Sequence, residues 1–223
     1  MEPHLFFVGE ASLAPTDGHG PVTVVPPVDG VPIHTQAQWA RFYFTKTEPE
    51  SVWITSDIDM FPLSQSYIID TVEGLADDCW ASLNSDAGNW FPVCYNVAKG
   101  QTFIEVVDFV DNFSDDVLRV YQNSFKAGIC DHKPSGQDAI FNHWGADEYY
   151  ISGALTNFRA KHPRRMVQCV RPSGHQSVRR VDRDDWSYDE EKASNGYYLD
   201  CHSLRPYSKH KDEIEKLLKI VFK

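Results

Sequence analysis

The sequence lacks a long apolar segment and a leader-like N-terminus. Among its 223 residues, no uninterrupted apolar run approaches the length of about eighteen residues that a membrane-spanning helix needs. The first residues, Met1–His4, show neither the basic nor the apolar region of a signal peptide. These absences predict a soluble, cytoplasmic protein without a transmembrane segment.

Paired cysteines are also missing, because the cysteines stand singly and no Cys-x-x-Cys pair occurs. This pattern argues against a structural zinc site and against a disulfide framework. We expect mostly buried thiols in a reducing compartment. The cysteines are Cys79, Cys94, Cys130, Cys169 and Cys201.

Positive charge is scarce, since the formal net charge is −11 at pH 7. A nucleic-acid partner is therefore disfavoured, because such proteins present a basic surface to phosphates. A small anionic nucleotide remains compatible, because a metal ion and a few arginines can neutralise it locally. The composition of 42% hydrophobic and 13% aromatic residues predicts a well-packed core in one α/β domain spanning residues 1–223.

Two carboxylates stand at the end of a predicted strand. A β-rich run that starts at Ser51 leads to Asp57 and Asp59, and Pro62 then prevents the strand from simply continuing. Side chains at i and i+2 of an extended chain point the same way, so both acids could bind one Mg²⁺ or Mn²⁺ ion. The pattern predicts a metal site that suits a diphosphate, with a solvated pair of surface acids as the alternative.

This motif and the residues before it resemble the core of GT-A glycosyltransferases. In that superfamily, a helix that ends in an Arg-aromatic pattern, here within residues 35–44, precedes the strand with the Asp-x-Asp motif, here within residues 52–63. The nearest resemblance is to nucleotide-sugar transferases of large algal viruses and phages. It extends over about residues 31–205, and only the Asp-x-Asp region is specific.

The resemblance implies an α/β/α sandwich with a mostly parallel central sheet. It also implies a hexosyl- or deoxyhexosyltransferase that uses Mn²⁺ or Mg²⁺. The donor would be a nucleoside-diphosphate sugar, of the UDP type by resemblance only, and the acceptor a hydroxyl of a glycan or glycoconjugate. GT-A domains open with a βαβ unit, whereas here strands are predicted at residues 4–9 and 21–25 with no helix between them. We therefore expect either an N-terminally truncated domain without its first β-α unit, which we favour, or a domain in which this unit is unusually reduced.

Other site residues follow from the same resemblance. In several metal-dependent GT-A families a C-terminal histidine is the third metal ligand and a nearby basic residue contacts the diphosphate, roles that His202 and Arg205 match in type and order. The aromatic-rich stretch 90–100 suggests Tyr95 and Asn96 as donor or acceptor contacts. The alternatives are an ordinary packed histidine and a half-buried strand.

Two adjacent acids, Asp147 and Glu148, enter a predicted helix. A carboxylate could act as general base toward the acceptor hydroxyl, and only one of the two can face a cleft. We assign Asp147 to the cleft and Glu148 to its support. Stabilisation of the helix dipole is the alternative role for both.

A basic run between Lys161 and Arg183 suggests a loop that holds phosphates, or else a solvated face. Its members are Lys161, Arg164, Arg165, Arg171, Arg179, Arg180 and Arg183.

Two rival functions also fit clustered acids. One is a metal-dependent phosphohydrolase or nuclease, and the other is a catalytically incomplete domain that binds a sugar or a partner.

Overall fold

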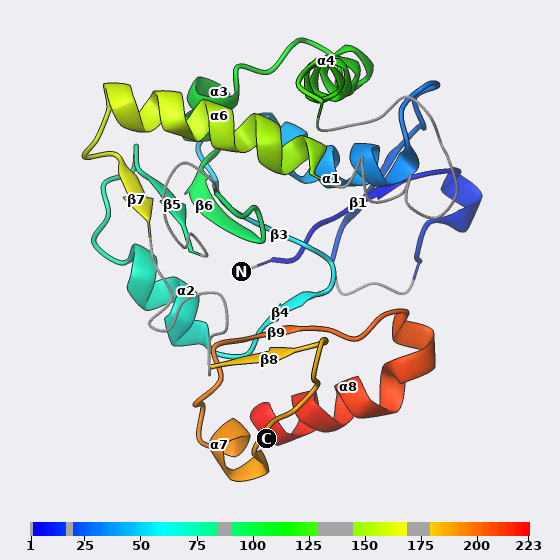
Figure 1. Ribbon diagram of the computed structural model, residues 1–223, viewed down its shortest axis with the longest axis vertical. Helices are drawn as coiled ribbons and strands as arrows, with labels where there is room; N and C mark the ends of the chain where they lie inside the picture. The colour runs from blue at the N-terminus through cyan, green and yellow to red at the C-terminus, as the bar shows by residue number, and fades with distance from the viewer. Residues whose placement is uncertain (1, 17–19, 84–90, 129–144, 169–178) are drawn as a thin grey trace.

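The computed structural model describes residues 2–16, 20–83, 91–128, 145–168 and 179–223 (Figure 1). These residues form a mixture of helices and strands, which confirms the α/β class, whereas the GT-A identity stays a prediction. Within the described ranges, no helix is long and apolar enough to cross a membrane. The strands are β1 (Leu5–Val8), β2 (Val22–Val25), β3 (Val52–Ser56), β4 (Met60–Pro62), β5 (Trp80–Ser82), β6 (Tyr95–Lys99), β7 (Met166–Gln168), β8 (Arg180–Asp182) and β9 (Asp200–His202). The α-helices are α1 (Ile33–Tyr43), α2 (Gln65–Val72), α3 (Gly100–Val107), α4 (Phe113–Lys126), α6 (Ala146–Lys161), α7 (Glu190–Ser194) and α8 (Tyr207–Val221).

The described strands form separate small sheets. A two-stranded parallel sheet pairs β1 with β2, a four-stranded sheet has the order β3-β6-β5-β7, and a three-stranded sheet has the order β4-β9-β8. In the four-stranded sheet β6 is antiparallel to both of its neighbours, and only β5 and β7 are parallel. The expectation of a mostly parallel central sheet is therefore wrong for the described strands. β5 and β6 are consecutive along the chain, and consecutive antiparallel strands need no crossover connection.

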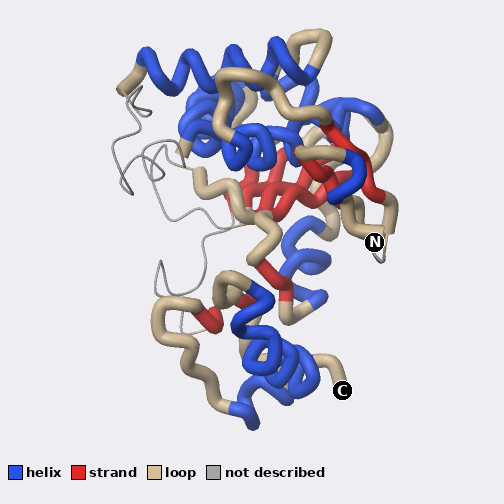
Figure 2. The backbone as a smooth tube through the Cα atoms, turned by 90° about the vertical axis from the view of Figure 1, so that its right-hand side faces the viewer, coloured by secondary structure: helices blue, strands red, loops and turns tan. Residues whose placement is uncertain are grey.

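The elements are arranged in layers. In Figure 1, α1, α3, α4 and α6 cover one side of the four-stranded sheet, and β4, β9 and β8 lie on its other side with α7 and α8 beyond them. Figure 2 shows the same order after a quarter turn. The three-stranded sheet thus lies between the four-stranded sheet and the C-terminal helices.

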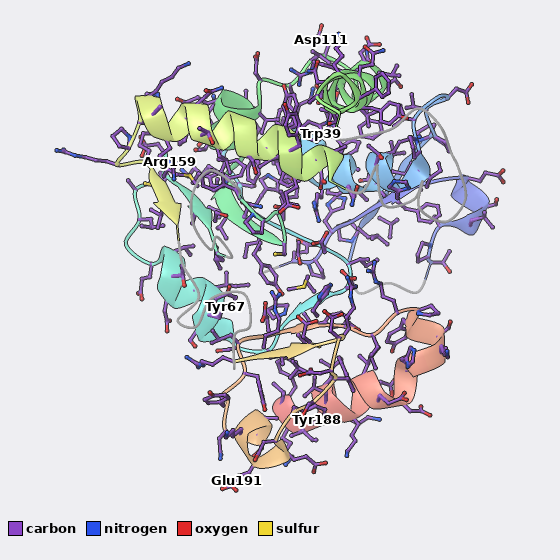
Figure 3. All side chains as sticks on the ribbon, viewed as in Figure 1. Trp39, Tyr67, Asp111, Arg159, Tyr188 and Glu191 are labelled. Carbon is purple, nitrogen blue, oxygen red and sulfur yellow. The ribbon has the colours of Figure 1, made fainter. Side chains whose placement is uncertain are left out.

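The largest cluster of buried side chains joins the helical layer to the four-stranded sheet. Trp39, Phe42, Trp80 and Phe103 are all fully buried in it. Trp39, labelled in the helical layer of Figure 3, donates a hydrogen bond from Nε1 to Oδ2 of buried Asp116 at 2.8 Å. This bond ties α1 to α4 and gives the buried indole N–H of Trp39 a partner.

Besides the helix at residues 35–44, the sequence predicts helices at residues 114–125 and, from its amphipathic apolar spacing, at residues 208–223, and the structure confirms the three as α1, α4 and α8. From the preference for hydroxyl side chains at helix starts, sequence reasoning predicts Thr35 and Ser114 as N-caps, and both predictions are wrong. Pro32 precedes α1, and Asn112 caps α4 by accepting a hydrogen bond from the backbone N–H of Asp115. Helix α4 therefore begins earlier than predicted, and the amide oxygen of Asn112 satisfies one of its first-turn N–H groups.

The N-terminal strands flank α1. β1 and β2 pair in parallel, with only a short 3-10 helix, Ala11–Leu13, among the described residues between them. Val8 and Val25 pack against Ala40 of α1. This contact brings the start of the chain beside the polar side of α1, where the candidate site lies.

Candidate functional site

Asp57 and Asp59 lie in a tight turn between β3 and β4. The backbone N–H of Met60 donates to the carbonyl of Asp57 at 3.1 Å, which closes the turn. The chain must turn here because β3 belongs to the four-stranded sheet and β4 to the three-stranded sheet. The expectation that both carboxylates project from one face of an extended strand is therefore wrong, and each has its own partners.

Asp57 and Asp147 are joined by one arginine. Nη1 of Arg41 in α1 contacts Oδ1 of Asp57, and Nη2 lies 2.6 Å from Oδ2 of Asp147 in the first turn of α6. The Arg41 and Asp147 side chains are only 11% and 2% exposed, whereas Asp57 is 34% exposed. Asp147 is thus buried against Arg41, whereas we expected it to face a cleft, and its neighbour Glu148 is half-buried.

Arg41, Asp57 and Asp147 form a triad in which burial and neighbouring charges act in opposite directions on the pKa values of Arg41 and Asp147. Burial opposes the charged guanidinium of Arg41, but Asp57 and Asp147 outweigh it and raise the pKa of Arg41 above its ordinary value. Burial raises the pKa of Asp147, although Arg41 acts in the opposite direction. The triad is therefore a desolvated charge cluster in which Arg41 supplies the balancing positive charge.

Asp59 is surrounded by basic groups from distant segments. Oδ2 of Asp59 lies 2.7 Å from Nη1 of Arg183, 3.1 Å from Nε of Arg205 and 3.7 Å from Nε2 of His202. Strand pairing produces this convergence, because β4 places Met60 opposite His202 and the N–H of Ser203 donates to the carbonyl of Asp59 at 2.7 Å. The structure thus brings together three residues that the sequence analysis had grouped: Asp59, His202 and Arg205.

The other ring nitrogen of His202 faces a second acid. Parallel pairing of β8 with β9 sets Asp182 opposite His202, and Oδ1 of Asp182 lies 3.5 Å from Nδ1 of the imidazole. Burial, followed by the charge of Arg183, lowers the pKa of His202. This shift favours the neutral ring, which is the form that binds metal ions.

A cavity of about 270 Å³ connects the two clusters. Its volume is close to the lower end of the range for small-ligand sites. A larger hollow, of about 1080 Å³, lies between α3, α4 and α6 and contains none of the predicted site residues. The smaller cavity, called the cleft below, is lined by His4, Leu5, Phe6, His34, Ala37, Gln38, Arg41, Ser56, Asp57, Ile58, Asp59 and Arg205.

Sequence reasoning missed the contribution of α1 to the cleft. One face of α1 is formed by residues at the spacing i, i+3, i+4, i+7, namely His34, Ala37, Gln38 and Arg41. Trp39 and Phe42 face the core instead. Polar side chains at this spacing, beside an otherwise buried face, were the available signal. Arg41 had been noted only as part of an Arg-aromatic pattern.

Tyr95 and Asn96 do not line the cleft. Both are fully buried in β6, which is a central strand of its sheet. Asn96 accepts a hydrogen bond from Nε1 of Trp80 at 3.1 Å and donates to the carbonyl of Val93 at 3.3 Å. Burial also raises the pKa of Tyr95 well above its ordinary value. Their positions favour the alternative of a packed strand over direct ligand contact.

The basic run divides among several roles. Arg165 forms a bidentate pair with a carboxylate of α3 at 2.8 and 2.6 Å, and Arg180 binds buried Asp200 at 2.7 Å. Among its described members, Arg183 contacts the predicted site, through Asp59. The other members are Lys161 and Arg164, which are exposed, Arg179, which donates to the carbonyl of Tyr197, and Arg171, which lies outside the described residues.

The residues at Asp59 fit a divalent cation in part. Two ligands at about 2.1 Å from one ion lie about 3 to 4 Å apart, so the 3.7 Å between Asp59 and His202 suits a shared ion. Asp57 is held by Arg41, and the described residues contain no group of three or more His, Cys, Asp or Glu that could hold a metal ion. Two protein ligands are enough where substrate phosphates complete the coordination.

Comparisons of the chain with protein-family models, with curated proteins and with solved structures found no match.

Proposed function

We propose that the chain is a metal-dependent, GT-A-like glycosyltransferase that moves a sugar from a nucleoside-diphosphate sugar to a hydroxyl of a glycan or glycoconjugate. The observation that carries the proposal is the convergence of His202 and Arg205 on one oxygen of Asp59. The sequence resemblance grouped these three residues, together with Asp57, as one metal and diphosphate site. Their proximity across the fold supports that grouping independently, because it arises from the pairing of β4 with β9.

The charges at Asp59 suit a cation and a diphosphate together. Asp59 and His202 would hold the Mn²⁺ or Mg²⁺ ion, which would stabilise the negative charge on the departing diphosphate. Arg205 is 44% exposed and Arg183 is 25% exposed, so both guanidinium groups have room to turn from Asp59 toward phosphate oxygens. Arginine forks pair well with such oxygens.

The rest of the cleft suits the nucleoside. Leu5 and Phe6 provide an apolar wall, and His34 and Gln38 provide hydrogen-bonding groups on the α1 side. This mixture fits a planar base with polar edges. The choice of UDP rests on the resemblance alone.

The general-base role of Asp147 gains no support from this geometry. Its carboxylate is buried against Arg41 and does not line the cleft. The contact instead favours a role for Asp147 in positioning Arg41. Glu148 does not line the cleft either, so its supporting role stays a prediction.

Calorimetry tests the proposal with UDP, GDP and a nucleoside monophosphate, each with and without Mn²⁺. The variant is Asp59→Asn, and the matched control is Asp77→Asn, an 82% exposed acid that pairs with Lys99 outside the cleft. We expect Mn²⁺-dependent binding of one diphosphate to the wild type and the control, and binding weaker by about tenfold or more in Asp59→Asn. Absence of nucleotide binding under all conditions would contradict the proposal.

The same experiment, combined with an activity assay, distinguishes the proposed function from its rivals. Nucleotide binding without sugar transfer to any acceptor would favour a catalytically incomplete domain. Release of inorganic phosphate from phosphate esters, without transfer, would favour a phosphohydrolase. Formation of a glycosylated acceptor together with the free nucleoside diphosphate is the outcome that the proposal expects.

A further inference from the structure

Arg41 differs from the arginines at Asp59 in how easily its guanidinium group can move away from its carboxylate partner. Arg183 and Arg205 are partly exposed, at 25% and 44%, so each can move its charge into solvent or onto a ligand. Arg41 is only 11% exposed and extends between α1, the turn after β3 and the first turn of α6. Its guanidinium is therefore mostly buried and held by two carboxylates at once.

The charge of Arg41 acts directly on Asp57. Nη1 of the guanidinium contacts Oδ1 of this carboxylate, while Nη2 is held 2.6 Å from Asp147. A divalent cation on Asp57 would lie within a few ångströms of the positive charge of Arg41, and like-charge repulsion at this distance opposes binding. Binding at Asp57 therefore requires that Arg41 be displaced toward Asp147.

We propose that Arg41 is a positioning residue that competes with the divalent cation for Asp57 and so keeps the affinity for free cation low. This inference rests on the proposed function, because that function places a cation in the cleft. While Arg41 contacts Asp57, its positive charge neutralises this carboxylate. The cation therefore first binds to Asp59 and His202. Asp147 provides the second carboxylate that holds Arg41 in place.

The test measures binding of Mn²⁺ alone by calorimetry. The double variant Arg41→Met/Asp147→Leu removes the buried pair, keeps the net charge and leaves no buried charge without a partner. Its matched control is Arg165→Met/Glu105→Leu, which removes another arginine–carboxylate pair of the fold, outside the cleft. Circular dichroism and an unfolding curve verify that each variant is folded.

We expect the Arg41→Met/Asp147→Leu variant to bind Mn²⁺ at least about tenfold more tightly than the wild type, and the control to match the wild type. Adding Asp57→Asn to the double variant should remove the gain, since Asp57 is the ligand that becomes accessible. Binding by the double variant alone, with none by the wild type, would support the competition and contradict a cation-dependent wild-type enzyme.

Two results would overturn the inference. Equal affinities in the wild type and the double variant, both lost with Asp59→Asn, would leave the proposed cation site standing and exclude competition by Arg41. No Mn²⁺ binding by any variant would remove both the cation site and the competition. The failure of the inference and the failure of the proposed function are thus distinguishable.

Discussion

Replacing Arg41 by methionine should destabilise the protein strongly. The substitution leaves the carboxylate of Asp147, with a side chain only 2% exposed, without its counter-charge. Breaking a buried ion pair from one side costs about 3–5 kcal/mol. Asp57 adds little, because it is 34% exposed and water can solvate it. For a chain of this length the loss corresponds to a fall in Tm of about 10 °C.

Urea unfolding followed by tryptophan fluorescence at pH 7 measures this loss. The Arg41→Met/Asp147→Leu variant should recover to within about 1 kcal/mol of the wild type, because a buried pair replaced on both sides by apolar groups is often neutral. The deficit of Arg41→Met should also shrink at acidic pH. The pKa of Asp147 is already raised by burial, so its contribution to stability is present at low pH and is lost as pH rises through that pKa.

Two results would refute the reasoning. Arg41→Met within about 1 kcal/mol of the wild type would show that Asp147 is not a buried charge paired with Arg41. A double variant as unstable as Arg41→Met alone would show that the loss comes from packing of the long side chain.

Two further predictions concern the scaffold. The hydrogen bond and charge of Arg165 lower the pKa of Glu105 from 4.5, so this pair stabilises the fold above about pH 4.5 and is lost as pH falls. Glu105→Gln should therefore be less stable than the wild type at pH 7, and the two unfolding curves should converge at acidic pH. In Gly100→Ala, the added Cβ would lie 2.4 Å from the Glu48 carbonyl and 2.5 Å from the Thr45 carbonyl, so urea unfolding should show a loss of about 3 kcal/mol. Equal stability in either case would contradict the contact invoked.

Local patterns in the sequence predicted many of the elements. The apolar spacing over Ser208–Lys223 predicted α8, and Asp115 and Asp116 predicted the acidic first turn of α4. Helical periodicity is a property of neighbouring residues, so it is visible without the fold. The same reasoning predicted that one of Asp147 and Glu148 faces a cleft, but neither lines it, and Asp147 is instead buried against Arg41.

Pairing between distant segments could not be predicted in the same way. The turn at Asp57 exists because the chain leaves one sheet and enters another, and no local signal marks that change. The burial of Asn96 follows from the position of β6 between β3 and β5. Register decides which side chains face inward, and a shift of one residue would reverse the face of every side chain.

The grouping of Asp59 with His202 and Arg205 was expected from the resemblance, whereas its physical cause is the register of β4 and β9. The contribution of Arg183 depends on a second pairing, between β8 and β9. Sequence analysis therefore named part of the site, and only the folded arrangement identified Arg41 and Arg183 as its counter-ions.

The most direct test of the central claim is a crystal structure of the protein with UDP or GDP and Mn²⁺, with the metal located by its anomalous signal. The account predicts a peak at about 2.1 Å from both Asp59 and His202, with the diphosphate oxygens between the ion and Arg205. A bound nucleotide with its diphosphate away from Asp59, or a manganese peak elsewhere on the protein, would contradict it.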